Sequence, residues 1–116
     1  MFNSGTEAER SAEKYLKQQG LRLKQRNFNT QFGEIDLIMM DGPTCVFVEV
    51  RYRNRASFVT PAETVNAAKQ ARLRRTAEYF LQVERLGDSI PCRFDVVSIT
   101  GQLGPRAEIL WIKNAF

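Results

Sequence analysis

Apolar and polar positions follow two different periods along the chain, and these periods predict its helices and strands. Over residues 6–19 the apolar side chains recur every three or four positions, which predicts an amphipathic helix that ends at Gly20. Its buried stripe is expected to contain Ala8, Ala12, Tyr15 and Leu16, with Glu9 at the edge.

Strand-like segments are recognised by alternation or by short apolar runs, and five of them occur. They cover residues 21–28, 33–40, 45–52, 92–100 and 107–113. The sequence DGPT at 41–44 contains the Gly and Pro of a tight turn, so the second and third strands should pair antiparallel.

A second helix is predicted from residue 61 to about residue 84. Thr60 would be its N-cap, Pro61 its first residue and Glu63 the acid of a capping box, and Gly87 would end it. The face that packs on the sheet should contain Val65, Leu73, Thr76, Phe80 and Val83.

The order is therefore helix, three strands, helix, two strands. This order predicts an α/β fold in which a mixed central sheet is flanked by helices. At 116 residues we expect a single domain, residues 1–116.

The composition is that of a globular protein, with 43% apolar and 26% charged residues. Charged residues interrupt every apolar run, so no membrane span is expected, and the N-terminal residues show no secretory signal. Cys45 and Cys92 lie in apolar surroundings and are expected to be small core residues of a reduced, cytoplasmic protein.

The chain contains no histidine, which limits the kinds of catalysis and metal binding that it can support. Ser-His-Asp and Cys-His catalysis, imidazole zinc sites and histidine general bases are all excluded. An enzyme built on this sequence must use carboxylates, Lys, Tyr or Cys.

Two carboxylates interrupt the best strand candidates, Asp36 in one and Glu49 in the next. If the hairpin register brings them together, their repulsion and burial would be relieved by a divalent cation. Oxygen ligands without His or Cys favour Mg²⁺ or Mn²⁺. These ions catalyse phosphodiester hydrolysis. The alternative is that Asp36 faces solvent and that Glu49 simply pairs with Arg51 or Arg53.

Positive charge is concentrated between residues 51 and 75, where seven basic residues accompany one acid. Such a concentration suits a polyanion such as nucleic acid, although a solvated helix face has the same composition. Lys69 falls within the apolar stripe of the second helix. It could extend its stem to the sheet edge, or it could reach the carboxylates.

The sequence resembles a known family at several of these points. GEIDLIMMDG, VFVEVRYR, KQARL and CRFDVV together resemble the YraN-type family of predicted bacterial endonucleases. That family is similar to archaeal Holliday junction resolvases and belongs to the PD-(D/E)XK nuclease superfamily, so the resemblance implies a restriction-endonuclease-like core. It also implies DNA as the partner, branched DNA included, and a homodimer by analogy with the resolvases.

The resemblance assigns roles to particular residues. Asp36 and Glu49 would be the metal ligands, with the carbonyl of Val50 a third. Glu9 matches an acidic residue on the first helix of related resolvases, and Gln70 matches a polar residue on the helix after the motif. The residues expected to contact nucleic acid are Arg51, Arg53, Arg55, Lys69, Arg72 and Arg75.

Two positions depart from the family motif: Ile35 stands at the proline of the motif, and Arg51 stands at its catalytic lysine. Arginine carries charge but does not give up its proton at working pH. Either Arg51 suffices as a positive charge, or Lys69 has taken over the role, since the motif lysine migrates within the superfamily. The leading hypothesis is thus a Mg²⁺- or Mn²⁺-dependent endonuclease. The alternatives are a nucleic-acid-binding domain that has lost the chemistry, and a plain interaction module.

Overall fold

The structure is a computed structural model, and it describes residues 4–53, 65–87 and 89–116. The element order agrees with the predicted one. The elements are α1 Ser4–Gln18, β1 Arg22–Thr30, β2 Gly33–Asp41, β3 Thr44–Arg53, α2 Ala67–Val83, β4 Cys92–Thr100 and β5 Glu108–Ile112.

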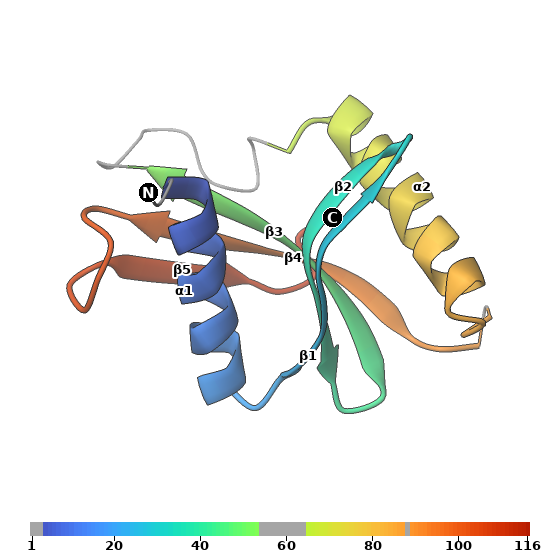
Figure 1. The fold of residues 1–116 in the computed structure, drawn as a ribbon, viewed down its shortest axis with the longest axis horizontal. Coiled ribbons are helices and arrows are strands. Elements are labelled where there is room, and N and C mark those ends of the chain that lie inside the picture. The colour runs from blue at the N-terminus through green and yellow to red at the C-terminus, as the bar shows by residue number, and fades with distance from the viewer. Residues whose placement is uncertain (1–3, 54–64, 88) are drawn as a thin grey trace.

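One five-stranded sheet forms the middle layer, with its strands in sequence order from β1 to β5. All neighbours are antiparallel except β3 and β4, which are parallel and are connected through α2. Helix α1 crosses in front of the sheet, and α2 lies beside β1 and β2 (Figure 1). The expected mixed α/β architecture is confirmed.

Each face of the sheet carries its own hydrophobic cluster. The cluster on the α1 side includes Ala8, Ala12, Leu16, Leu37, Met39, Val46, Val48, Val97 and Ile99. The cluster on the α2 side includes Ile35, Ile38, Cys45, Phe47, Leu73, Ala77, Phe80 and Val96. The predicted stripe of α1 is confirmed, because Ala8, Ala12 and Leu16 are all buried.

The alternation of side chains along β2 is broken at Asp36. Simple alternation would put Ile35 on the same face as Leu37 and Met39, but Ile35 packs on the α2 side and the other two pack on the α1 side. The break coincides with the end of β2–β3 pairing, whose last pair is Leu37 with Val48. Asp36 therefore stands where the two strands separate.

Helix α2 begins later than the sequence indicated. Asn66 is its N-cap, accepting a hydrogen bond from the backbone N–H of Lys69, and Ala67 is the first helical residue. The predicted cap residues Thr60, Pro61 and Glu63 lie outside the described residues. Asn66 is also a preferred capping residue, and its side chain satisfies an N–H that the helix leaves unpaired.

Two core predictions are wrong in detail. Val83 is exposed, because the chain turns at Arg85 (φ 56°) and brings Leu86 instead against the α2-side cluster. Cys92 is exposed while Cys45 is buried, since Cys92 is the first residue of β4; both thiols are free.

In the part of the chain that the structure describes, no helix is long and apolar enough to cross a membrane.

Candidate functional site: an acidic pocket with basic partners

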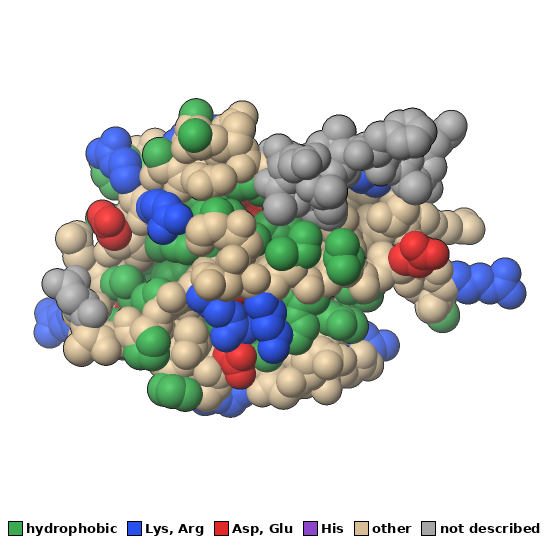
Figure 2. Space-filling model, turned by 180° about the vertical axis from the view of Figure 1, so that it is seen from behind, with side chains coloured by type: hydrophobic (Ala, Val, Ile, Leu, Met, Phe, Trp, Pro, Cys, Tyr) green, Lys and Arg blue, Asp and Glu red, His purple; other side chains and the backbone are tan. Residues whose placement is uncertain are grey.

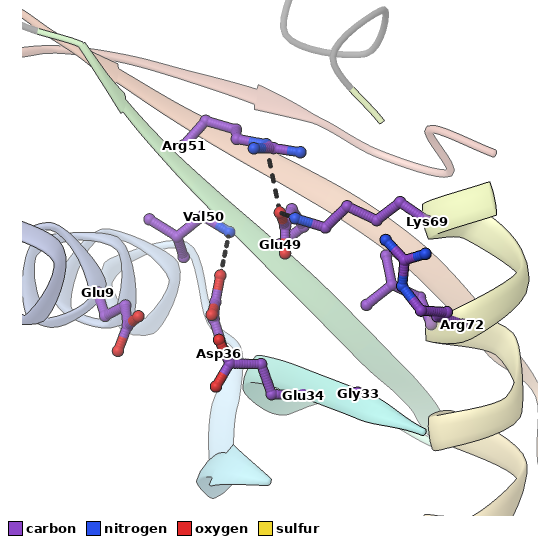
Figure 3. Close-up of a pocket in the computed structure, with 10 residues that line it drawn as sticks. Glu9, Gly33, Glu34, Asp36, Glu49, Val50, Arg51, Lys69 and Arg72 are labelled. Carbon is purple, nitrogen blue, oxygen red and sulfur yellow. Dashed lines mark hydrogen bonds and ion pairs between the residues drawn. The ribbon is translucent and has the colours of Figure 1, made fainter. Parts of the chain in front are cut away.

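A pocket of about 380 Å³ opens where α1, the ends of β2 and β3, and the first turns of α2 come together (Figure 3). Six of the side chains predicted from the sequence meet there: Glu9, Asp36, Glu49, Arg51, Lys69 and Arg72. Its lining consists of Glu9, Gly33, Glu34, Asp36, Glu49, Val50, Arg51, Lys69, Arg72 and Leu73.

The Asp36 carboxylate is held by a backbone hydrogen bond at the point where β2 and β3 separate. The backbone N–H of Val50 donates a hydrogen bond of 2.8 Å to Oδ2 of Asp36. Since β2 no longer pairs with β3 beyond Leu37, the Asp36 carboxylate takes the place of a backbone acceptor for this N–H. The local irregularity of the sheet thus positions a carboxylate at the pocket.

Glu49 is only 6% exposed and is held by two cations. Lys69 Nζ lies 2.5 Å from its Oε2 and Arg51 Nε lies 3.2 Å from the same oxygen. Of the two accounts of Lys69, the structure supports the one in which it reaches the carboxylate site. The proposed alternative for Glu49, an ion pair with Arg51, is present at the same time.

Two acidic groups of the pocket, Asp36 and Glu9, have raised pKa values, because burial and neighbouring carboxylates both disfavour their charged forms. Burial, together with the charge of Glu49, raises the pKa of Asp36 to about 7, although the Val50 hydrogen bond opposes this increase. Burial also raises the pKa of Glu9, with the charge of Glu34 adding to it. Perturbed carboxyls gathered in a pocket are typical of functional sites.

The donor set of the pocket fits a hard divalent cation. Asp36 and Glu49 both line it, and a dication would offset the burial and the repulsion by Glu49 that together raise the pKa of Asp36. Among the described residues, however, no three acidic or thiol side chains stand close enough to hold a metal ion. A bound Mg²⁺ or Mn²⁺ would therefore depend on two carboxylates and on backbone oxygen and water.

The other predicted residues are placed as follows. Glu9 faces the pocket from α1, and Arg72 lines it from α2. Gln70 is not part of the lining; its Nε2 donates to the carbonyl of Val65 at 2.9 Å and holds the chain that enters α2. Arg53 lies at the end of β3 and is likewise not among the lining residues, whereas Arg55 falls outside the described residues.

Sequence reasoning did not select Glu34, which lines the pocket and raises the pKa of both Glu9 and Asp36. The available signal was its spacing, because Glu34 and Asp36 are two positions apart on one strand.

Beyond the pocket, on the side that α1 does not cover, Lys and Arg side chains lie among exposed hydrophobic ones (Figure 2).

Comparison with known proteins gives the family. The model of the uncharacterised protein family UPF0102 matches residues 8–99, so the chain belongs to the UPF0102 family. A UPF0102 protein of Coxiella burnetii (strain RSA 331) is 50% identical over 111 residues, which is 96% of this chain and 89% of that protein. A UPF0102 protein of Pseudomonas savastanoi pv. phaseolicola is 48% identical over 113 residues, covering 97% of this chain and 92% of the relative.

Proposed function

We propose that this protein is a metal-dependent endonuclease that hydrolyses phosphodiester bonds in DNA, branched DNA included, in the cytoplasm. The observation that carries the proposal is the convergence of Asp36, Glu49 and Lys69 on one pocket, from two strands and a helix. Carboxylates that bind a divalent ion, beside cations that bind phosphate, are the parts that phosphodiester hydrolysis requires.

Asp36 and Glu49 would hold Mg²⁺ or Mn²⁺ at the pocket. When bound, the ion supplies charge that polarises a phosphate oxygen and acidifies water. Arg72, which is exposed and lines the pocket, can hold a backbone phosphate, and its guanidinium matches two phosphate oxygens at once.

Lys69 is the residue to which we assign the role of the motif lysine. It is a cation that can exchange its proton, whereas Arg51 cannot. Both contact Glu49 Oε2, so each lies beside the expected metal ligand. Arg51 would then act as a permanent positive charge that holds Glu49 and the phosphate.

A second candidate function is a nucleic-acid-binding domain without catalysis. The observation in its favour is that Lys69 and Arg51 already neutralise Glu49, so that the protein can keep this acid buried without a metal ion. In that case the basic groups would bind DNA through phosphate contacts alone.

The test is a cleavage assay with branched, flapped and linear DNA in Mg²⁺ or Mn²⁺. We expect the wild-type protein to cut at least one substrate and Asp36→Asn, purified in the same way, to lose at least about 100-fold in rate, as removal of one essential electrostatic group does. Glu108→Gln, at an exposed carboxylate on β5, should keep full activity. Metal-independent DNA binding with no cleavage of any substrate would favour the second candidate.

Two further variants separate the roles of the cations. If Lys69 has the role of the motif lysine, Lys69→Ala should abolish cleavage and Arg51→Lys should leave it nearly unchanged. An undiminished rate in Lys69→Ala would remove Lys69 from the mechanism.

A further inference from the structure

The turn between β1 and β2 presents a phenylalanine beside the acidic pocket. Thr30 Oγ1 accepts a hydrogen bond from the Phe32 N–H at 3.0 Å and donates one to the Gly33 carbonyl at 3.1 Å, which fixes the turn. Gly33 has a φ of 152° and lies against α2, since a Cβ there would be 3.4 Å from Thr76 Oγ1. Phe32 is therefore held in place rather than carried on a loose tip.

An arginine lies over this ring, and a tyrosine contacts it edge to face. The guanidinium carbon of Arg75 lies 4.3 Å from the Phe32 centroid, and the Tyr79 ring lies 6.1 Å from Phe32 at 68°. Phe28 connects Tyr79 to the core, with centroids 6.2 Å from Tyr79 and 5.1 Å from Phe80. A continuous line of aromatic rings thus runs from the buried core to the surface.

The outer end of this line is exposed and positively charged. Tyr79 is 43% exposed, and both Arg72 and Arg75 are exposed. The nearby acid on the helix, Glu78, lines a different hollow together with Leu81, Gln82 and Gly87. Planar aromatic groups with arginines beside them suit a ligand that offers flat rings on an anionic backbone.

The surface is continuous with the pocket. Gly33, next to Phe32, lines the pocket, and so does Arg72, which precedes Tyr79 by two turns on the same helix. A nucleic acid whose phosphate lies at Arg72 would therefore place a neighbouring nucleotide over the turn. A paired base offers its flat face only at a helix end, so the surface favours bases that are out of the stack.

We propose that Phe32, Tyr79 and Arg75 form a stacking platform for an unpaired nucleobase next to the phosphodiester at the acidic pocket. The inference rests on the proposed function in taking nucleic acid as the ligand, and it specifies the substrate as DNA with an unpaired base at a branch, flap or gap. Phe32 and Tyr79 select the unpaired base, and Arg75 holds the Phe32 ring and adds positive charge.

The experiment uses full-length protein in EDTA and two DNA probes of equal length. One is a fully paired duplex, and the other carries a single unpaired 2-aminopurine. Stacking on an aromatic ring should quench the fluorescence of the 2-aminopurine, and the wild-type protein should bind this probe at least about tenfold more tightly than the duplex.

The variants test the rings themselves. Phe32→Ala and Tyr79→Ala should lose the quenching and most of the preference. Phe32→Leu, which keeps an apolar side chain of similar size, should also lose them, while Tyr79→Phe should keep them. Lys14→Ala, at an exposed lysine on α1, is the matched control and should behave as wild type.

The outcomes separate this inference from the proposed function. Cleavage that depends on Asp36, with equal affinity for both probes or with unchanged quenching in Phe32→Leu, overturns the platform alone. Preference and quenching that depend on Phe32, with no cleavage under any metal, support the platform and overturn the nuclease proposal. Absence of binding to both probes overturns the platform, and absence of cleavage in Mg²⁺ or Mn²⁺ as well overturns both.

Discussion

Replacing Asp36 with Asn should stabilise the protein, and by an amount that depends on pH. Burial and the charge of Glu49 raise the pKa of Asp36 from 3.8 to about 7, so the folded protein binds this proton more tightly than the unfolded chain does. Every tenfold gain in proton affinity corresponds to about 1.4 kcal/mol, so the ionised carboxylate costs the folded state roughly 4 kcal/mol.

The sign and the pH window follow from the two pKa values. Below a pH of about 4 both states are protonated and the cost is absent; it grows as the pH rises towards 7 and is complete above that. Asparagine carries no charge at any pH and still offers an oxygen to the Val50 N–H. The unfolding free energy of Asp36→Asn should therefore exceed that of wild type by an amount that increases between about pH 4 and pH 7 and reaches about 2 to 4 kcal/mol at pH 8.

The assay is urea unfolding followed by circular dichroism from pH 4 to pH 8. Glu108→Gln, at an exposed carboxylate, is the control and should stay within about 0.5 kcal/mol of wild type. At pH 8, Mg²⁺ should stabilise wild type and leave Asp36→Asn unaffected, because the ion binds only the ionised site. A difference that is the same at every pH, or a variant less stable than wild type at pH 8, would refute the reasoning.

Three further changes have defined outcomes. Lys69→Met leaves the buried Glu49 with one cation fewer and should lower the unfolding free energy by about 1 to 3 kcal/mol, with Mn²⁺ restoring part of the loss in thermal unfolding. Glu13→Gln should destabilise the protein by about 1 to 2 kcal/mol at pH 7. Because a hydrogen bond from Arg26 lowers the pKa of Glu13 from 4.5 to about 2, the difference should vanish as the pH falls from about 4.5 through 2, and an equal loss at pH 2 would contradict this account. Trp111→Phe removes the indole N–H that donates to the fully buried Asp95 at 2.9 Å and should cost about 1 to 3 kcal/mol in urea unfolding; an unchanged midpoint would show that the other donors suffice.

Most of the fold could be predicted from the sequence because its signals are local. The 3.6-residue period gave the buried stripe of α1, and Gly20, with a φ of 100°, ends that helix region as expected. The start of α2 was predicted less well: Thr60 was expected to be the N-cap, whereas Asn66 is the cap of the described helix, and both residue types are favoured at this position.

Some members of the site could be predicted from the sequence, but its geometry could not. Polar residues within apolar strands indicated Asp36 and Glu49, and helical spacing indicated Lys69. The break in alternation at Asp36 depends on where β2 leaves β3, which is a tertiary feature with no local signal. Gln70 had the right position in the sequence, but its amide is used by the carbonyl of Val65.

The division of the core between two sides of the sheet has a consequence for how the chain could be cut or shortened. Glu9 lies on the layer in front of the sheet, Lys69 on the opposite layer, and Glu34, Asp36 and Glu49 on the strands between them. A cut between β3 and α2 would leave these acids on one fragment and Lys69 on the other. Mixing the two fragments should therefore restore the site only if they reassociate into the complete three-layer structure.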